Sequence, residues 1–283
     1  MTTRPIAGLS ALADAYALFI IDQWGVLHDG AKAYPGAPAA LKALKALGKQ
    51  VVILSNSGKR PHTSYTRMGQ LGFDRSMYDE VVTSGGQLYD ALLRRETSPY
   101  AGLGEKVFVF PWDDDRDLLA GLPYGEVKDL DDADWILCSG ADRERLEAYE
   151  ADLKRARARD LPLLVANPDF VTVRPDGSLQ MCPGAIARAY EELGGTAFWH
   201  GKPTPGIYAM CRALGGDGPA IGIGDSLHHD IQGAAGAGMA SLLITQGIHK
   251  DELGRQPAPD AIVTLAEQYR VPAPDFAMEG FRW

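Results

Sequence analysis

The sequence predicts an α/β protein with a parallel sheet at its core, and three observations support this class. Buried-strand patterns at 17–21 and 50–54 flank a helical pattern at 39–47, and connections this short favour a right-handed βαβ unit. A later apolar run at 220–223 ends in a polar cluster, as the two earlier runs do. The carboxyl ends of parallel strands lie at one edge of a sheet, where open α/β proteins bind ligands. We therefore expect a Rossmann-like parallel sheet with a ligand site at that edge.

The length of the chain suits two domains. It has 283 residues and a mass of 30.5 kDa, and a typical domain has about 150 residues. From residue 87 the pattern changes to short strands separated by acidic, turn-rich segments, and this middle block is itself α/β. We expect an inserted α/β domain at 87–197, between two parts of a core domain at 1–86 and 198–283.

The other elements follow from hydrophobic spacing and turn residues. In the core, the pattern predicts helices at 9–16, 61–72 and 233–238, a helix opened by His200-Gly201-Lys202-Pro203, and strands at 80–83, 241–244 and 261–263. In the inserted block, it predicts strands at 107–110, 135–138 and 163–166, a solvated acidic turn at 129–134, a long charged helix at 143–159, a hairpin at 171–179 turning at Pro175-Asp176-Gly177, and a helix at 184–193.

Composition narrows the class of protein. Hydrophobic residues make up 46% and charged residues 23%, as in ordinary soluble globular proteins. The net charge of -9 argues against nucleic acid as a partner, since phosphate backbones are held by clustered Lys and Arg. No apolar run is long enough to cross a bilayer and no signal peptide is evident, so no membrane association is expected. Cys138, Cys182 and Cys211 fit neither a disulfide framework nor a zinc spacing, which favours reduced thiols in a cytoplasmic protein.

Candidate chemistry lies where the strands end. Asp22 and Asp225 each follow an apolar run, and the fold is expected to bring the two carboxylates together. A cation between them would offset their repulsion, and two oxygen ligands with substrate and water suit Mg²⁺. Ser55, with Asn56 beside it, can donate a hydrogen bond to a phosphate, and Lys202 can supply a fixed positive charge.

The ordered set resembles the haloacid dehalogenase superfamily of phosphatases, in particular its class IIA branch, which includes nitrophenyl-, nucleotide- and pyridoxal-phosphatase-like enzymes. Four segments look like the family's motifs in order: Asp22-Gln23-Trp24-Gly25-Val26-Leu27, Ser55-Asn56-Ser57, Gly201-Lys202-Pro203, and Gly224-Asp225-Ser226 through Asp230. Three further segments look like class IIA spacers: Leu71-Gly72-Phe73, Val82-Thr83-Ser84 and Asn167-Pro168-Asp169.

The resemblance implies a catalytic group and a metal site. Asp22 would attack phosphorus and form an acyl-phosphate. Lys202 would neutralise the charge of the phosphoryl group. Asp225 would hold Mg²⁺ together with Asp22 and the backbone carbonyl of Trp24, with Asp230 in or beside the outer coordination shell.

The resemblance also implies substrate-binding groups and a lid. Ser55, helped by Asn56, would bind the transferring phosphoryl group. From the residues themselves, Asn167 and Asp169 either reach the substrate from the inserted domain or form a plain turn, for which Asn-Pro-Asp is equally suited. That domain would be a cap that closes over the site, excludes water and contributes to specificity.

Trp24 departs from the family's pattern, which has an Asp at this position as the acid and base for the leaving alcohol and the hydrolytic water. An indole can only donate a hydrogen bond. Losing acid–base catalysis costs a factor of about 100 to 10,000 in rate, so good leaving groups are expected to be favoured over alkyl phosphates. His28 and Asp29 are either replacements for the missing group or plain turn residues. His228 and His229 are expected to face the cap cleft or solvent, because magnesium prefers oxygen ligands.

These observations leave alternatives for function and assembly. The leading hypothesis is a magnesium-dependent phosphatase acting on a small phosphorylated metabolite. The alternatives are a phosphate- or phosphometabolite-binding protein with little turnover, motivated by Trp24, and a phosphoryl transferase that uses another acceptor. The tail at 276–283 could pack on a partner subunit in a homodimer or on its own core.

Overall fold

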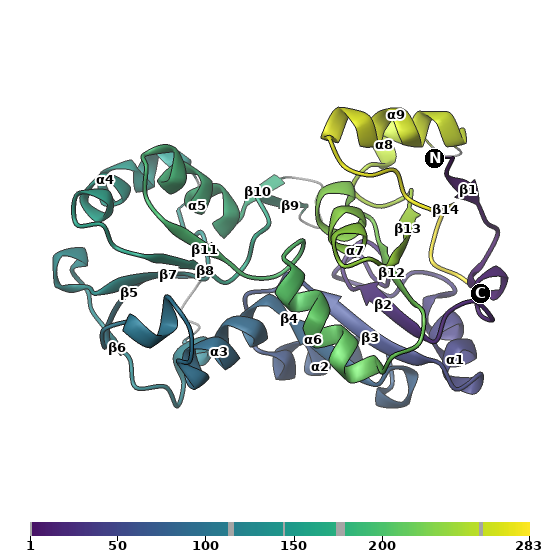
Figure 1. The fold of residues 1–283 in the computed structure, drawn as a ribbon, viewed down its shortest axis with the longest axis horizontal. Helices are drawn as coiled ribbons and strands as arrows, with labels where there is room; N and C mark the ends of the chain where they lie inside the picture. The colour runs from purple at the N-terminus through teal and green to yellow at the C-terminus, as the bar shows by residue number, and fades with distance from the viewer. Residues whose placement is uncertain (1, 113–115, 144, 174–178, 255–256) are drawn as a thin grey trace. The chain divides into compact units, whose positions relative to one another are not determined.

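Figure 1 presents the computed structural model, which describes residues 2–112, 116–143, 145–173, 179–254 and 257–283. The chain divides into two compact units. The first consists of Met1–Ser55, His62–Val82 and Lys202–Trp283, and the second of Asn56–Pro61 and Thr83–Gly201. The expected insertion at 87–197 falls within the longer segment of the second unit, and its role as a cap remains a prediction.

The first unit is built around one sheet, whose described strands run in the order β1-β14-β13-β12-β2-β3-β4 (Figure 1). The strands are β1 (Arg4–Pro5), β2 (Leu18–Asp22), β3 (Gln50–Ser55), β4 (Glu80–Thr83), β12 (Ala220–Gly224), β13 (Ala240–Ile244) and β14 (Phe276–Met278). Pairing is parallel between β1 and β14, β14 and β13, β13 and β12, β12 and β2, and β2 and β3. The predicted parallel, Rossmann-like core is therefore confirmed.

The strand register brings three predicted site residues to one edge. Asp22 pairs with Leu54, so Ser55 lies one residue beyond it on the neighbouring strand. On the other side Ile21 pairs with Ile223, so Asp225 follows the end of β12 at the same edge. This is the carboxyl edge at which the sequence predicted a ligand site.

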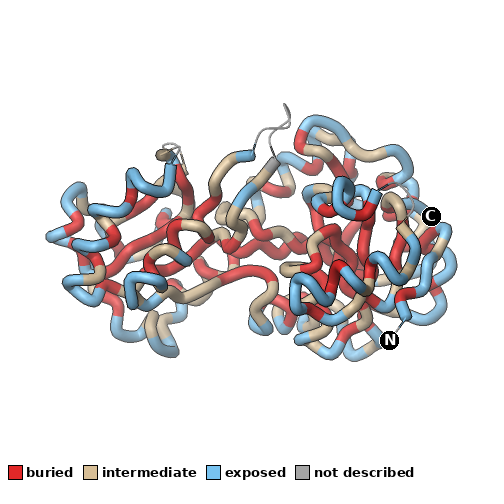
Figure 2. The backbone as a smooth tube through the Cα atoms, turned by 90° about the horizontal axis from the view of Figure 1, so that it is seen from above, coloured by how far each residue is buried: buried red, intermediate tan, exposed pale blue. Residues whose placement is uncertain are grey.

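Helices cover this sheet, and its inner strands β2 and β12 are buried at every residue. The helices of the unit are α1 (Ala37–Ala46), α2 (Pro61–Gln70), α6 (Pro205–Gly215), α7 (Gln232–Gly236), α8 (Lys250–Leu253) and α9 (Pro259–Tyr269), with 3₁₀ turns at Leu9–Ala11 and Arg75–Met77 and a π-helical turn at Leu227–Ile231. In β2, Phe19 and Ile21 pack in one hydrophobic cluster, while Leu18 and Ile20 pack in another. Successive side chains of a strand point to opposite faces, so a strand that is apolar throughout is one covered on both sides. Figure 2 shows buried residues, in red, in the interior of each unit.

Two expected elements of this unit are wrong. The segment 9–16 contains only the short 3₁₀ turn rather than a helix. The expected strand at 261–263 lies inside α9, where Ile262, Leu265 and Ala266 form a buried face at helical spacing and Pro259 stands in the first turn. A short apolar run does not by itself distinguish a strand from a buried helix segment.

The tail packs on its own chain. Phe276 begins β14, which lies between β1 and β13, and Phe281 is only 2% exposed. A Cβ on Gly8 would lie 2.2 Å from the backbone oxygen of Trp283, so the end of the chain passes directly over that glycine.

The second unit has a parallel sheet of its own, with described strands in the order β11-β8-β7-β5-β6. The strands are β5 (Lys106–Phe110), β6 (Gly125–Glu126), β7 (Trp135–Cys138), β8 (Leu163–Val165) and β11 (Ala197–Trp199), and the helices are α3 (Ser84–Arg94), α4 (Glu150–Ala158) and α5 (Pro183–Glu192), with 3₁₀ turns at Tyr100–Gly102, Asp117–Leu119, Leu130–Asp132 and Leu146–Tyr149. The expected long helix at 143–159 is shorter, because α4 starts at Glu150 after the last of these turns.

The expected hairpin is present as β9 (Val171–Val173) and β10 (Leu179–Met181), which pair antiparallel. Its turn at Pro175-Asp176-Gly177 lies outside the described residues.

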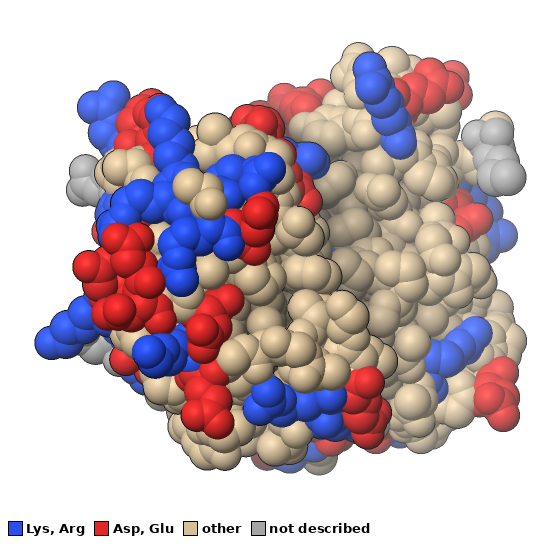
Figure 3. All heavy atoms as spheres, turned by 60° about the vertical axis from the view of Figure 1, so that its left-hand side comes forward, with Lys and Arg blue, Asp and Glu red and all other residues tan. Residues whose placement is uncertain are grey.

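The acidic run at 129–134 is a solvated turn, as predicted. Arg155 forms ion pairs with Asp129 at 2.7 Å and with Asp131 at 2.8 Å, and all three side chains are largely exposed. On the face that Figure 3 shows, acidic and basic side chains lie next to one another. Over the described ranges, no helix combines the length and apolarity needed to cross a bilayer.

Candidate active site

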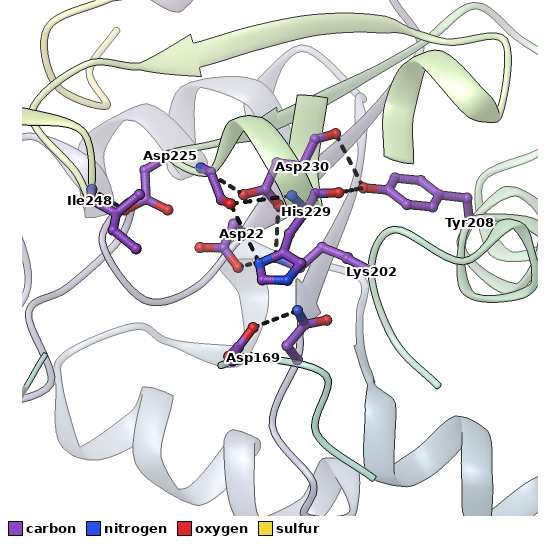
Figure 4. A network of polar contacts seen from close by, with 10 residues as sticks. Asp22, Asp169, Lys202, Tyr208, Asp225, His229, Asp230 and Ile248 are labelled. Carbon is purple, nitrogen blue, oxygen red and sulfur yellow. Dashed lines mark hydrogen bonds and ion pairs between the residues drawn. The ribbon is translucent and has the colours of Figure 1, made fainter. Parts of the chain in front are cut away.

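Asp22 ends β2 and meets a lysine from a distant part of the chain. Lys202 Nζ bonds Asp22 Oδ1 and also Asp230 Oδ1, the latter at 2.7 Å (Figure 4). Asp22 is 8% exposed, Lys202 3% and Asp230 4%. One buried cation therefore bridges two buried carboxylates.

Asp225 completes an acidic cluster with these two residues. One carboxylate oxygen from each of Asp22, Asp225 and Asp230 lies within 4.8 Å of the others. Asp225 follows β12 directly, and Asp230 lies on the π-helical turn, where its Oδ2 accepts a hydrogen bond from the Ser226 amide at 3.1 Å. Turns of this kind are frequent at functional sites.

Two glycines and one amide fix the position of Asp225. A Cβ on Gly25 would lie 2.1 Å from Asp225 Oδ2, and Gly25 has a φ of +85°. A Cβ on Gly247 would lie 2.1 Å from the Cβ of Asp225. The Ile248 amide donates to Asp225 Oδ2 at 2.9 Å (Figure 4). The carboxylate is thus held where no larger side chain fits beside it.

The protonation of the cluster reflects its burial. Burial raises the pKa of Asp22 well above its usual range; Lys202 opposes this rise, and Asp230 and Asp225 add to it. Burial, reinforced by Asp230, raises the pKa of Asp225 to about 7, against the hydrogen bond from Ile248. Burial opposes the charge of Lys202, but Asp22 and Asp230 outweigh it and raise its pKa well above the usual value.

The donor set fits a hard divalent cation. Three buried carboxylates at this spacing offer oxygen ligands, and Mg²⁺ prefers oxygen. Burial and mutual repulsion raise the pKa of Asp22 and Asp225, and a cation between them would remove that repulsion. Among the residues that the structure describes, the cluster that could hold a metal is made of carboxylates. The ring of His229 contacts Ser226 Oγ at 3.4 Å through Nδ1, and the expectation that His228 and His229 face the cap cleft or solvent stays a prediction.

Trp24 lies in the loop after Asp22 with its side chain 45% exposed. Its ring crosses Gly30, where a Cβ would lie 2.2 Å from Cη2, and packs edge-on against His28 with ring centroids 5.7 Å apart. The indole is therefore supported on two sides by its own loop.

The two candidate replacements for an acid–base group have different surroundings. Asp29 accepts hydrogen bonds from the amides of Lys32 and Ala31, which lower the pKa of its carboxyl, and this is the arrangement of a plain turn residue. His28 is 1% exposed, and burial, helped by Arg67, lowers its pKa to about 4, so the imidazole is neutral at pH 7. His28 Nδ1 accepts from the Gly30 amide, which leaves the proton on Nε2; within the described part of the chain, Nε2 has no hydrogen-bond partner. A role for His28 in proton transfer stays a prediction.

Ser55 ends β3 in the first unit, whereas the three other predicted substrate-binding residues belong to the second unit. Asn56 Nδ2 donates to Asp169 Oδ1 at 2.8 Å, and the Asp169 amide donates to Asn167 Oδ1 at 2.9 Å. The structure thus brings Asn56, Asn167 and Asp169 together. It groups Asp22, Lys202, Asp225 and Asp230 separately, within the first unit.

The sequence patterns missed several supporting residues. Tyr208 on α6 is buried, and its hydroxyl donates to the backbone oxygens of His229 and Asp230 at 3.2 and 3.3 Å. Nothing in its helical spacing separates it from an ordinary core tyrosine. Gly247 and Ile248 could have been suspected as site residues, since they follow the end of β13 at the same sheet edge.

Comparison with known proteins identifies the family. A model described as haloacid dehalogenase-like hydrolase matches residues 19–124, and a second, HAD-hydrolase-like, matches residues 199–267. Together they include the five predicted site residues Asp22, Ser55, Lys202, Asp225 and Asp230.

Relatives and solved structures agree with this match. Chronophin of Homo sapiens is 28% identical over 250 residues, covering 82% of this chain and 82% of its own. A haloacid dehalogenase-like hydrolase from Brucella suis has a TM-score of 0.82 at 29% identity, covering 98% of this chain and 99% of its own. Glycerol phosphate phosphatase from Mycobacterium tuberculosis, solved with magnesium, shares the fold with a TM-score of 0.65 at 22% identity, covering 92% and 75%.

Phosphoric monoester hydrolases stand among these relatives, as the sequence led us to expect. The four ordered motifs, the parallel-sheet core and the two matched models lead to one conclusion: the chain belongs to the haloacid dehalogenase-like hydrolases.

Proposed function

We propose that the protein is a magnesium-dependent phosphatase that hydrolyses a small phosphorylated metabolite through an aspartyl-phosphate on Asp22. The observation that carries this proposal is the buried cluster in which Asp22, Asp225 and Asp230 lie within 4.8 Å of one another and Lys202 bridges two of them. Phosphatases among the relatives support the reaction class.

The metal would be held by Asp22, Asp225 and the backbone carbonyl of Trp24, with Asp230 in the outer coordination shell. When bound, Mg²⁺ supplies positive charge that screens the phosphate from the carboxylate nucleophile. The glycerol phosphate phosphatase structure with magnesium supports the choice of ion. Gly25 and Gly247 keep Asp225 in place for this role.

The residues of the chain carry out two displacements. A carboxylate oxygen of Asp22 attacks phosphorus, the bond to the leaving oxygen breaks, and the leaving group departs as an anion that takes a proton from water. A water oxygen then attacks phosphorus, the bond to Asp22 breaks, and inorganic phosphate and the carboxylate are released while a proton passes to solvent. Ser55 donates to a phosphoryl oxygen, and Lys202 offsets the negative charge.

Phosphate release over a panel of phosphomonoesters, with and without Mg²⁺, tests the proposal. We expect release that requires Mg²⁺ and falls to background in Asp22→Asn. Asp14→Asn, at an exposed site, is the matched control and should retain turnover. Magnesium-independent release, or equal release from Asp22→Asn, would contradict the mechanism.

A second candidate function rests on Trp24. Its exposed indole stands where the family's pattern has a carboxylic acid, which favours a protein that binds a phosphometabolite with little turnover. Calorimetry would then detect magnesium-dependent ligand binding without hydrolysis. Rapid hydrolysis of an alkyl phosphate would exclude this candidate.

A further inference from the structure

Asn56 is a buried residue at a point where the chain passes from one compact unit to the other. It follows Ser55, the last residue of β3, and only 6% of its surface is exposed. Its Nδ2 donates to Asp169 Oδ1 at 2.8 Å, across 113 positions of sequence. The residue next to the predicted phosphate ligand is thus tied to the Asn-Pro-Asp turn.

That turn is itself held in place. The Asp169 amide donates to Asn167 Oδ1 at 2.9 Å, closing the turn locally. The Gly184 amide, at the start of α5, donates to the Asp169 carbonyl at 3.0 Å. A Cβ on Gly184 would lie 2.3 Å from the carbonyl oxygen of Pro168, so the turn lies directly on the first turn of the helix. Asp169 therefore presents its carboxylate from an anchored backbone.

The oxygen of the Asn56 side-chain amide faces Gly201, the residue at which the chain leaves the second unit. A Cβ on Gly201 would lie 2.7 Å from Asn56 Oδ1 and 2.8 Å from Ser84 Oγ. Gly201 has a φ of +89°, and its amide donates to Gln87 Oε1 at 2.8 Å. Lys202 is the next residue. A single side-chain amide thus contacts Asp169 with its nitrogen and packs with its oxygen on the residue before Lys202.

We propose that Asp169 is a positioning residue for the phosphate site and acts through Asn56. The inference rests on the proposed function, because Ser55 and Lys202 are the phosphate-binding residues of that proposal. The sequence-based expectation made Asp169 a direct substrate ligand. A carboxylate facing a phosphate dianion would repel it, whereas a carboxylate bonded to Asn56 fixes the orientation of the amide. Asp169 therefore affects every phosphomonoester equally, whatever its leaving group.

The test compares four variants: Asp169→Ala, Asp169→Asn, Asn56→Asp, and the double variant Asn56→Asp with Asp169→Asn. Asp169→Ala removes the acceptor, whereas Asp169→Asn keeps one. Asn56→Asp places a second carboxylate against that of Asp169, so the hydrogen bond is replaced by repulsion. In the double variant the new Asn at 169 can donate to the new Asp at 56, which restores the hydrogen bond in the opposite direction. Asp132→Ala, at an exposed position of the same unit, is the control.

The readouts are KM for p-nitrophenyl phosphate and for glycerol phosphate, the inhibition constant of inorganic phosphate, and the melting temperature. We expect Asp169→Ala to raise all three constants by about tenfold, and Asn56→Asp to raise them further. Asp169→Asn and the double variant should return all three to within about threefold of wild type.

Three results would overturn the inference. One is a rise in KM for Asp169→Ala without a rise in the inhibition constant of phosphate, which would mark a direct substrate ligand. Another is no change in any constant. The third is a double variant whose KM values and inhibition constant are as high as those of Asn56→Asp. This comparison can be made even if Asp169→Ala does not fold.

The phosphatase proposal fails separately, if wild type releases no phosphate from any ester. Calorimetric titration with inorganic phosphate then replaces the kinetic constants for the same variants.

Discussion

Lys202 forms an ion pair with Asp22, although the two residues stand 180 positions apart in the sequence. The same nitrogen bonds Asp230 at 2.7 Å, and none of the three residues is more than 8% exposed. A buried charge that loses its partner stays poorly solvated, so such a cation stabilises its surroundings even where the pair as a whole contributes little. Lys202 is thus expected to matter for both folding and chemistry.

Replacing Lys202 with Met should lower both stability and activity. Two buried carboxylates would lose their bridging cation, which costs about 3–5 kcal/mol of unfolding free energy. Turnover of p-nitrophenyl phosphate should fall by a factor of about 100 to 1,000, because a charge aimed at the phosphoryl group is lost. Urea unfolding and steady-state kinetics measure the two effects. Lys42→Met, at an exposed site on α1, should change neither, and a Lys202→Met enzyme within a few-fold of wild type would refute the assignment.

Replacing Gly25 with Ala should weaken metal binding through Asp225. The new Cβ would lie 2.1 Å from Asp225 Oδ2 at a φ of +85°, so both the carboxylate and the backbone must shift. We expect the thermal stabilisation by Mg²⁺ to be largely lost. Gly69→Ala is the control: this glycine lies within α2 with nothing near its Cβ position, and the change should stabilise the helix by about 0.5–1 kcal/mol. An undiminished magnesium shift in Gly25→Ala would argue against Asp225 as a ligand.

Replacing Trp24 with Asp should supply an acid for the leaving alcohol and a base for the hydrolytic water. Hydrolysis of an alkyl phosphate should rise by a factor of about 100 to 10,000, while p-nitrophenyl phosphate, whose leaving group needs no proton, should change far less. The ratio of kcat/KM for the two substrates measures this effect. Trp24→Phe controls for loss of the indole. A wild-type enzyme that already hydrolyses both esters equally would show that another group supplies the proton.

Stability should fall as the pH drops from about 6.5 to 4, in part because of His200. Its Nδ1 lies 2.9 Å from the Val165 carbonyl, which only accepts, so Nε2 accepts from the Tyr100 hydroxyl at 2.6 Å. Burial lowers the pKa of His200 to about 4. The unfolded chain, with a histidine pKa near 6.5, therefore binds more protons in this window, and stability that is complete above pH 6.5 is lost as the pH falls towards 4.

The His200 contribution amounts to about 3 kcal/mol if the full shift is realised. The difference between wild type and His200→Gln in unfolding free energy, measured from pH 7.5 to 4, isolates it from other titrating groups. Parallel curves for the two proteins would rule out this contribution.

The sequence predicted the core correctly where a short local pattern, such as an apolar run, was enough to identify an element. The apolar runs that end at Asp22 and Asp225 identify buried parallel strands, and register alone then brings both residues to one edge. Where the signal is ambiguous, prediction failed, as at 261–263, whose apolar residues continue a helix. The support around the site depends on contacts between distant segments: Tyr208 reads as an ordinary helix residue, and no local pattern joins Asn56 to Asp169.

The hydrogen bond between Asn56 and Asp169 also determines which segments must be exchanged together in a chimaera of this protein and a relative. A chimaera that exchanges only the long segment, 83–201, would take Asp169 from one parent and Asn56 from the other. Residues 56–61 belong to the same compact unit as that segment, although 21 residues of the other unit, His62–Val82, lie between them in sequence. The exchangeable module is therefore discontinuous, and a functional swap must carry both pieces from the same parent.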